Sequence, residues 1–202
     1  IEKECTLRGV LYEPVNASTL GSIFGVIDQN NMDVVLLEKK PKIAVYAPPG
    51  NQPWDDAVTM VLTYAEIDYD VIFDDEVIAG KLSRYDWLHL HHEDFTGQYG
   101  KFYRNYHNAS WYKQQKAEFE ATAFKYGYPS VSELKKAIAR IIRDYVIEGG
   151  FMFAMCSAAD SFEIALATEK TDIAASVYDD TPIDPNYKSK INFSKSFAFE
   201  NY

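Results

Sequence analysis

The sequence predicts an α/β protein whose strands form a mostly parallel, doubly wound sheet of the flavodoxin-like kind. Four short apolar runs, at 43–46, 69–73, 86–90 and 151–155, have the length of buried strands. Stretches with helical periodicity separate them, and alternating strands and helices build parallel sheets through right-handed crossovers. In a flavodoxin-like order the runs at 43–46, 86–90 and 151–155 are neighbours at the centre of the sheet.

The expected helices and strands fall into two parts of the chain, residues 1–40 and residues 41–202. We expect residues 1–40 to form an N-terminal segment, packed on or leading into the domain, with a strand at 7–12 and a weak helix at 19–27. We expect residues 41–202 to form the α/β domain and to be a fragment of a longer protein. Its expected helices cover 54–67, 130–147 and 158–167, with a short helix or turn at 77–82, a long insertion at 91–129 and a loop-like end at 168–202.

The longest expected helix has clear end signals. Ser130 is an N-cap residue, and Glu133 three positions later completes the pattern of a capping box. Gly149 and Gly150 end the helix directly before the last strand.

Composition excludes some classes of protein. The 202 residues carry a net charge of −10, which disfavours nucleic acid because that ligand is bound through Lys and Arg. No apolar run approaches the roughly 20 residues of a membrane-spanning helix. The two cysteines, Cys5 and Cys156, do not form the pattern of a disulfide scaffold, and they leave the compartment open.

Cys156 follows a short apolar strand and precedes a helix. A nucleophile at such a strand–turn–helix lies above the sheet edge, and the positive end of the helix favours the thiolate. The other interpretation is a buried, inert thiol, because free cysteine is often buried. The backbone N–H groups of Cys156 and Ser157 form a possible oxyanion hole.

Three distinctive loops follow strands that are neighbours in the predicted order, and ligands bind beyond the carboxyl ends of such strands. The loops contain Pro49 and Gly50, then His91-His92-Glu93-Asp94, then Cys156 and Ser157. His91 or His92 is the expected base toward Cys156, with Glu93 or Asp94 orienting it. Pro49, Gly50, Asp94 and Ser157 are expected to contact the ligand.

The histidine loop has two other interpretations. It is a polar loop with His89 hydrogen-bonded in the core, or His89 and His91, on one side of a strand, hold a divalent metal with Glu93 or Asp94. No other His or Cys cluster completes a metal site in the sequence, so the prediction is no metal and no cofactor. His107 stands apart in the insertion as a surface residue.

The insertion is rich in aromatic residues, among them Tyr99 and Trp111. Such rings bind sugars, peptides or partner proteins, and Tyr99 and Trp111 are the candidate contacts. Alternatively the insertion is a lid that packs its rings on the domain.

The segment Gly149–Ala158 resembles the nucleophile elbow of class I glutamine amidotransferase-like domains. Together with Pro41–Tyr46, Gln52–Ala57 and Tyr85–Tyr103, it is similar to exported Bacteroidetes proteins labelled asparagine synthetase B. This resemblance covers nearly the whole chain and implies an amidotransferase-like fold, an exported or periplasmic location and a nucleophile at Cys156. The chain lacks the N-terminal cysteine and the Ser-Gly-Gly-x-Asp-Ser loop of a synthetase of that name.

Two departures from the amidotransferase pattern affect the site. No histidine follows Cys156, and His91-His92-Glu93-Asp94 stands where the glycine-rich oxyanion loop is usual. We therefore expect a cysteine hydrolase acting on an amide or acyl substrate, with its base in this loop or outside the chain. The competing expectation is a non-catalytic module that binds a small molecule, sugar or peptide; the oligomeric state stays open.

Overall fold

A computed structural model describes residues 2–33, 40–50, 56–98 and 100–200, and the chain divides into two compact units, Ile1–Lys40 and Pro41–Tyr202. The first unit contains helices α1 (Glu2–Leu7) and α2 (Ala17–Gln29), neither of which has a buried residue. Asn16 caps α2 by accepting the Thr19 N–H at 2.9 Å. The helix expected at 19–27 is confirmed.

The strand expected at 7–12 is wrong. Leu7 ends α1, and the following residues up to the cap of α2 have no strand structure. An isolated strand gains nothing without a partner to take its hydrogen bonds, and the described part of this unit contains no other strand.

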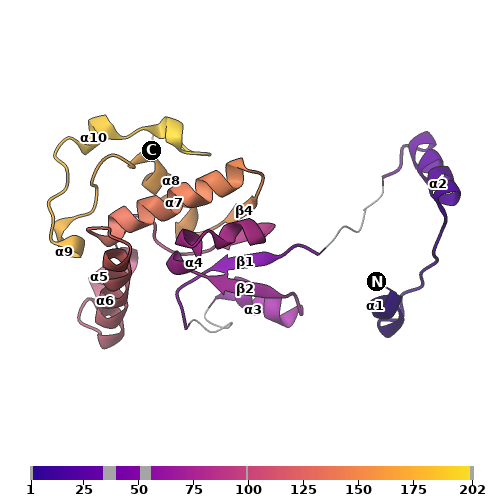
Figure 1. The fold of residues 1–202 in the computed structure, drawn as a ribbon, viewed down its shortest axis with the longest axis horizontal. Helices are drawn as coiled ribbons and strands as arrows, with labels where there is room; N and C mark the ends of the chain where they lie inside the picture. Colours follow the sequence, from indigo (N-terminus) through magenta and orange to yellow (C-terminus); the bar gives the residue numbers. More distant parts are fainter. Residues whose placement is uncertain (1, 34–39, 51–55, 99, 201–202) are drawn as a thin grey trace. The chain divides into compact units, whose positions relative to one another are not determined.

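The second unit is built on a four-stranded, all-parallel sheet in the order β2-β1-β3-β4 (Figure 1). The strands are β1 (Ile43–Tyr46), β2 (Tyr69–Ile72), β3 (Trp87–Leu90) and β4 (Phe151–Ala154). The predicted α/β class and parallel sheet are confirmed, and each strand lies where its apolar run predicted it. β1, β3 and β4 are neighbours as expected, but β4 is an edge strand of the described sheet rather than a central one.

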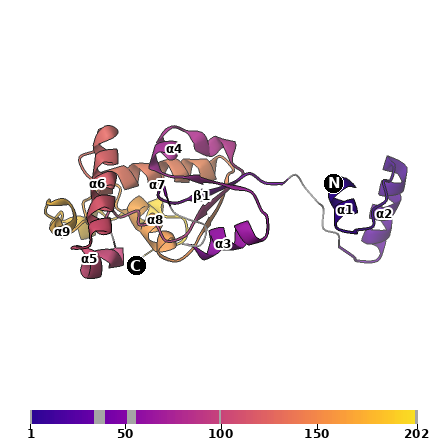
Figure 2. The ribbon, with the colours of Figure 1, turned by 90° about the horizontal axis from the view of Figure 1, so that it is seen from below.

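Helices flank the sheet, with α4 (Asp74–Ile78) and α7 (Val131–Ile147) on one side of the strands and α3 (Ala57–Tyr64) on the other (Figure 2). The insertion expected at 91–129, for which no secondary structure was predicted, contains the helices α5 (Gly100–Tyr106) and α6 (Ser110–Lys125). The remaining helical bounds are η2 (Lys81–Arg84), α8 (Ser157–Ala167), α9 (Ser176–Asp179), α10 (Tyr187–Lys190) and η3 (Phe193–Lys195).

The end signals of α7 are confirmed, with one difference. The Ser130 hydroxyl accepts the Glu133 N–H at 3.3 Å, which is one half of the predicted capping box. The Glu133 carboxylate instead accepts a hydrogen bond from buried Lys136 at 2.7 Å. At the other end Gly149 adopts φ +102°, and the N–H of Gly150 closes the turn on the Tyr145 carbonyl.

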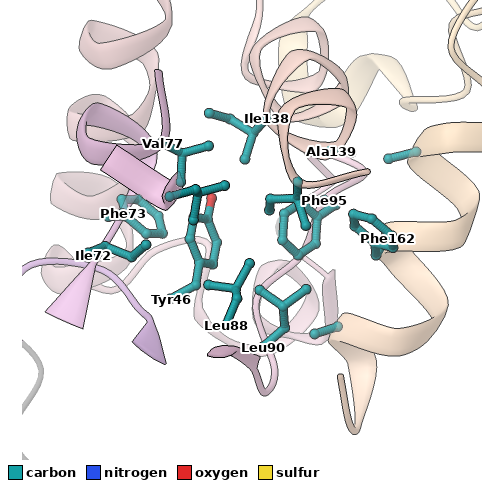
Figure 3. Packing of buried hydrophobic residues seen from close by; sticks show 14 of the residues in the cluster. Tyr46, Ile72, Phe73, Val77, Leu88, Leu90, Phe95, Ile138, Ala139 and Phe162 are labelled. Carbon is teal, nitrogen blue, oxygen red and sulfur yellow. The ribbon is translucent and has the colours of Figure 1, made fainter. Parts of the chain in front are cut away.

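The main core lies between the sheet and the helices α4, α7 and α8 (Figure 3). Tyr46, Leu88 and Leu90 project from the strands toward Ile138 of α7, while Phe162 comes from α8. Side chains of this size contribute about 1.5–3 kcal/mol each when fully buried. The core therefore fixes the carboxyl ends of β1 and β3 against these three helices.

The opposite face of the sheet has a smaller core. Ile43 and Val45 of β1 are buried against Leu62 of α3, whereas Phe151 and Phe153 of β4 are about half exposed.

A membrane-spanning segment must be both long and apolar, and none of the described helices meets both requirements.

Candidate functional site

Cys156 occupies a sharp turn between β4 and α8. Its backbone angles are φ +54° and ψ −141°, a combination that residues other than glycine rarely adopt. Its side chain is exposed. The turn directs the thiol away from the core at the first residue before α8. The interpretation of Cys156 as a buried small residue does not fit this exposure.

The loop after β3 lies beside this turn. The Met155 N–H donates to the Leu90 carbonyl at 3.1 Å, and the Ala158 N–H donates to the His91 carbonyl at 3.3 Å. The Ser157 hydroxyl donates to the His92 carbonyl at 3.0 Å. Residues on both sides of Cys156 are thus tied to the 90–92 segment, because the β3–β4 pairing continues past the strand ends.

His91 is paired through its ring with Asp56, the N-cap residue of α3. His91 continues the side of β3 from which His89 projects, and that side is the one covered by α3. The Nδ1 atom of His91 contacts Oδ2 of Asp56, and both side chains are largely buried. The partner of the His91 ring is therefore Asp56, rather than Glu93 or Asp94 as the sequence suggested.

The two oxygens of Asp56 have different partners. Oδ1 accepts the N–H groups of Val58 and Thr59 at 2.6 and 3.1 Å, which caps α3. Oδ2 faces His91 and lies 3.7 Å from Nε2 of His92. Burial opposes ionisation, but the hydrogen bonds from His91 and from the two N–H groups outweigh it and lower the pKa of Asp56. Asp56 is thus an anion that fixes the tautomer of His91, with the proton on Nδ1.

The other histidines have distinct surroundings. The His92 side chain is about one-third exposed, and its ring centroid lies 4.2 Å from that of His91. The His89 ring is buried, stacks on Phe153, and neither of its nitrogens has a hydrogen-bond partner in the described structure. Burial and the nearby His91 lower the pKa of His89, so it is neutral. The sequence interpretation of His89 as hydrogen-bonded in the core is therefore wrong.

Glu93 and Asp94 support the loop. The buried Glu93 carboxylate accepts the backbone N–H of His91 at 3.3 Å, and burial raises the pKa of Glu93. Asp94 accepts the N–H groups of Thr96 and Gln98 at 2.8 and 3.1 Å. Both carboxylates hold the backbone of the loop rather than a histidine ring.

A mostly apolar cavity of 380 Å³ opens next to this loop. Its volume lies in the range of sites for small ligands. The loop provides His92, Glu93 and Asp94, and helix α6 provides an aromatic wall. The lining residues are Pro48, Phe73, His92, Glu93, Asp94, Gly97, Phe102, Trp111, Tyr112, Gln115, Phe119, Val131, Lys135 and Ser157.

The expected ligand contacts are only partly brought together. Asp94, Ser157 and Trp111 line this cavity, while Cys156 does not. Pro49 lines a second cavity of 410 Å³ with acidic walls. Gly50 lines neither cavity and adopts φ +91°, and Tyr99 lies outside the described residues.

The aromatic residues of the insertion pack on one another. Trp111 lies 5.2 Å from Tyr106 and 6.0 Å from Phe102, measured between ring centroids. The ring of Trp111 is nevertheless half exposed where it borders the cavity. His107 is in the exposed part of this segment, as expected.

Asp56 is the site residue that sequence reasoning missed. The sequence places it in the first turn of the helix expected at 54–67, whereas in the structure it is the N-cap residue of the shorter α3. An N-cap aspartate uses one oxygen for the helix and leaves the other available. The signal was therefore an acidic cap on the helix that covers the histidine side of the sheet.

No protein-family model, no curated protein and no solved structure matches this chain.

Proposed function

We propose that the protein is a cysteine hydrolase that acts on an amide or related acyl substrate. The observation that carries the proposal is the strained, exposed turn at Cys156, tied on both sides to the loop that bears the His91–Asp56 pair. A nucleophile, a base and a group that orients the base are the three parts that such chemistry needs.

In this mechanism the Nε2 atom of His91 takes the proton of the Cys156 thiol. The thiolate attacks the acyl carbon, and the protonated His91 then gives its proton to the leaving amine as the C–N bond breaks. A water molecule hydrolyses the resulting thioester with His91 again as base, which returns the free thiol. Asp56 stabilises the imidazolium that forms twice in the cycle.

The oxyanion that forms on the acyl group needs hydrogen-bond donors. The backbone N–H groups of Cys156 and Ser157 have no acceptor among the described residues, so they are the proposed donors. They lie at the N-terminus of α8, where the helix dipole adds positive potential.

The sheet order also supports the finer assignment of the fold. β2-β1-β3-β4 matches the first four strands of a doubly wound, flavodoxin-like sheet, the arrangement expected of an amidotransferase-like domain. The proposal places the reaction at the carboxyl ends of β3 and β4, where ligands bind in such sheets.

Alkylation by iodoacetamide at neutral pH tests the activated thiol. We expect Cys156 to react faster than Cys5, which serves as an internal reference, because the proposed mechanism gives Cys156 a base in His91 whereas residues 1–40 contain no histidine. His91→Gln should slow the reaction at Cys156 and leave Cys5 unchanged. Equal rates at the two cysteines, unaffected by His91→Gln, would contradict the mechanism.

Turnover is tested on a panel of p-nitrophenyl esters and p-nitroanilides. Cys156→Ser should lose turnover while the circular dichroism spectrum and the unfolding midpoint stay those of the parent. Asp56→Asn should keep the cap of α3 and lower turnover, because Asn caps helices as well as Asp but carries no charge. Turnover that survives Cys156→Ser would exclude the cysteine as nucleophile.

The cavity favours a second candidate function, a non-catalytic module that binds a sugar, a peptide or another small molecule. Trp111 borders the cavity and Cys156 does not. Titration with sugar and peptide panels, followed by tryptophan fluorescence, tests this function. Binding that Trp111→Ala loses and Cys156→Ala keeps, without any turnover, would support the module over the hydrolase.

A further inference from the structure

The side chains at the strand ends form a cluster of which the proposed hydrolase uses Asp56 and His91 but not His92. We propose that Asp56, His91 and His92 form a binding site for a divalent transition metal ion, of which Zn²⁺ is the best match. Each residue offers one ligand atom, and the three atoms all lie within 4.8 Å of one another. Among the described residues this is the one group of its kind.

The distances suit a small ion. Two ligand atoms of a tetrahedral Zn²⁺ are separated by about 3.3 Å, given metal–ligand distances of about 2.0–2.1 Å. Nε2 of His92 lies 3.7 Å from Oδ2 of Asp56. Nδ1 of His91 contacts the same oxygen directly, so an ion would replace the proton between them and the His91 ring would turn away from Asp56 to admit it.

The surroundings hold the ligands in place. Oδ1 of Asp56 is fixed by the N–H groups of Val58 and Thr59, so Oδ2 is the oxygen directed at the histidines. The backbone of His91 is held by Glu93, and that of His92 by Ser157. Such outer contacts are what orient metal ligands in proteins.

Below the three ligands the buried ring of His89 lies 6.0 Å from the ring of His91, between centroids, and its nitrogens have no partner in the described structure. A buried imidazole without partners is costly. The neutral His89 ring therefore places a further hydrogen-bond acceptor next to the three ligands. The exposed part of the His92 side chain leaves a position open for a fourth ligand on the ion.

The ligand set selects the ion. Two imidazoles and one carboxylate suit Zn²⁺ and similar transition metals, whereas Mg²⁺ and Ca²⁺ prefer oxygen ligands. Three protein ligands with an open position are typical of zinc sites that exchange a water or another ligand.

Metal binding would prevent His91 from acting as the base of the proposed hydrolase. If Nδ1 of His91 binds the ion, the ring proton moves to Nε2, the atom that takes the thiol proton in the proposed hydrolase. This consequence rests on the proposed function, and it predicts that Zn²⁺ inhibits turnover. The site itself is independent of that function.

The test is titration of Zn²⁺ into protein stripped with EDTA, in competition with a chromophoric chelator. We expect one equivalent to bind and Mg²⁺ not to compete. Asp56→Asn and His92→Gln should each weaken binding at least about tenfold, since each removes a ligand. His107→Gln is the matched control and should bind as the parent does, because His107 is far from the site in sequence and exposed.

Three outcomes would overturn the site: no stoichiometric binding, equal affinity of His92→Gln and the parent, or an equal loss in His107→Gln. If Asp56→Asn fails to fold, His92→Gln decides, because His92 caps no helix. Turnover is measured separately on the EDTA-stripped protein, because Zn²⁺ is expected to inhibit it. A stripped parent that is inactive and yet binds Zn²⁺ contradicts only the hydrolase. An active parent that binds none contradicts only the metal site.

Discussion

Cys156 holds a backbone conformation that costs free energy. A residue with a side chain at φ +54° and ψ −141° is strained by about 1–3 kcal/mol, and glycine is the residue that tolerates it. The surrounding hydrogen bonds from Met155 and Ala158 to the β3 loop maintain the turn. A strained turn that keeps a cysteine is expected where the thiol is needed.

Cys156→Gly should therefore raise the free energy of unfolding by about 1 kcal/mol, because glycine relieves the strain at the cost of some backbone entropy. Cys156→Ala keeps the side-chain strain and is the control. Urea denaturation measures both variants. A Cys156→Gly variant no more stable than Cys156→Ala would show that the turn is unstrained.

At the scale of elements, the loop after β3 is shaped by its contact with α7. Gly97 adopts φ +72°, and a Cβ atom there would lie 2.6 Å from the backbone of Ser132. The loop therefore packs directly on the first turn of α7. This contact, together with the turn made by Asp94, sets the position of the residues that border the cavity.

Gly97→Ala should destabilise the protein by about 2–4 kcal/mol, the sum of a left-handed backbone and a steric clash. Gly80→Ala is matched to it, with φ +73° and nothing within 4 Å of the new Cβ, and should cost about 1 kcal/mol. Thermal unfolding compares the two. Equal losses would mean that the loop moves away from α7 at no cost.

For the whole molecule, buried polar groups in the core make stability depend on pH. Lys135 of α7 bonds both carboxylate oxygens of Asp74, at 2.8 and 2.9 Å, and the Tyr46 hydroxyl at 2.8 Å. Burial and the Asp74 charge raise the pKa of Tyr46. Burial, followed by nearby Tyr178 and Tyr103, raises the pKa of Tyr112 to about 12.

Both tyrosines are neutral in the folded protein at pH values where unfolded tyrosines ionise. Their contribution is fully present below about pH 10 and is lost as pH rises through the folded pKa values. The unfolding midpoint in urea should fall between about pH 10 and 12. Tyr112→Phe should flatten this fall, whereas Tyr64→Phe, at an exposed position, should leave it unchanged. An identical fall in all three proteins would contradict the assignment.

The local pattern of apolar and turn residues correctly predicted the strands and the longest helix of the second unit. Apolar runs bounded by turn residues predicted the four strands, and Ser130 with Gly149 and Gly150 predicted both ends of α7. It failed at residues 7–12, where the same kind of run has no partner strand in the described unit. It also missed α5 and α6, because the stretch at 91–129 was identified only as a long insertion rich in aromatic residues.

Local residue patterns were enough to predict the class of the fold, the turn at Cys156 and the polar loop after β3, because neighbouring residues decide periodicity and caps. The pairing of His91 with Asp56, 35 positions away, became evident from the three-dimensional arrangement alone. That pairing depends on which side of the sheet α3 covers and on how the strands are ordered. Both are set by packing between distant segments, which no local pattern records.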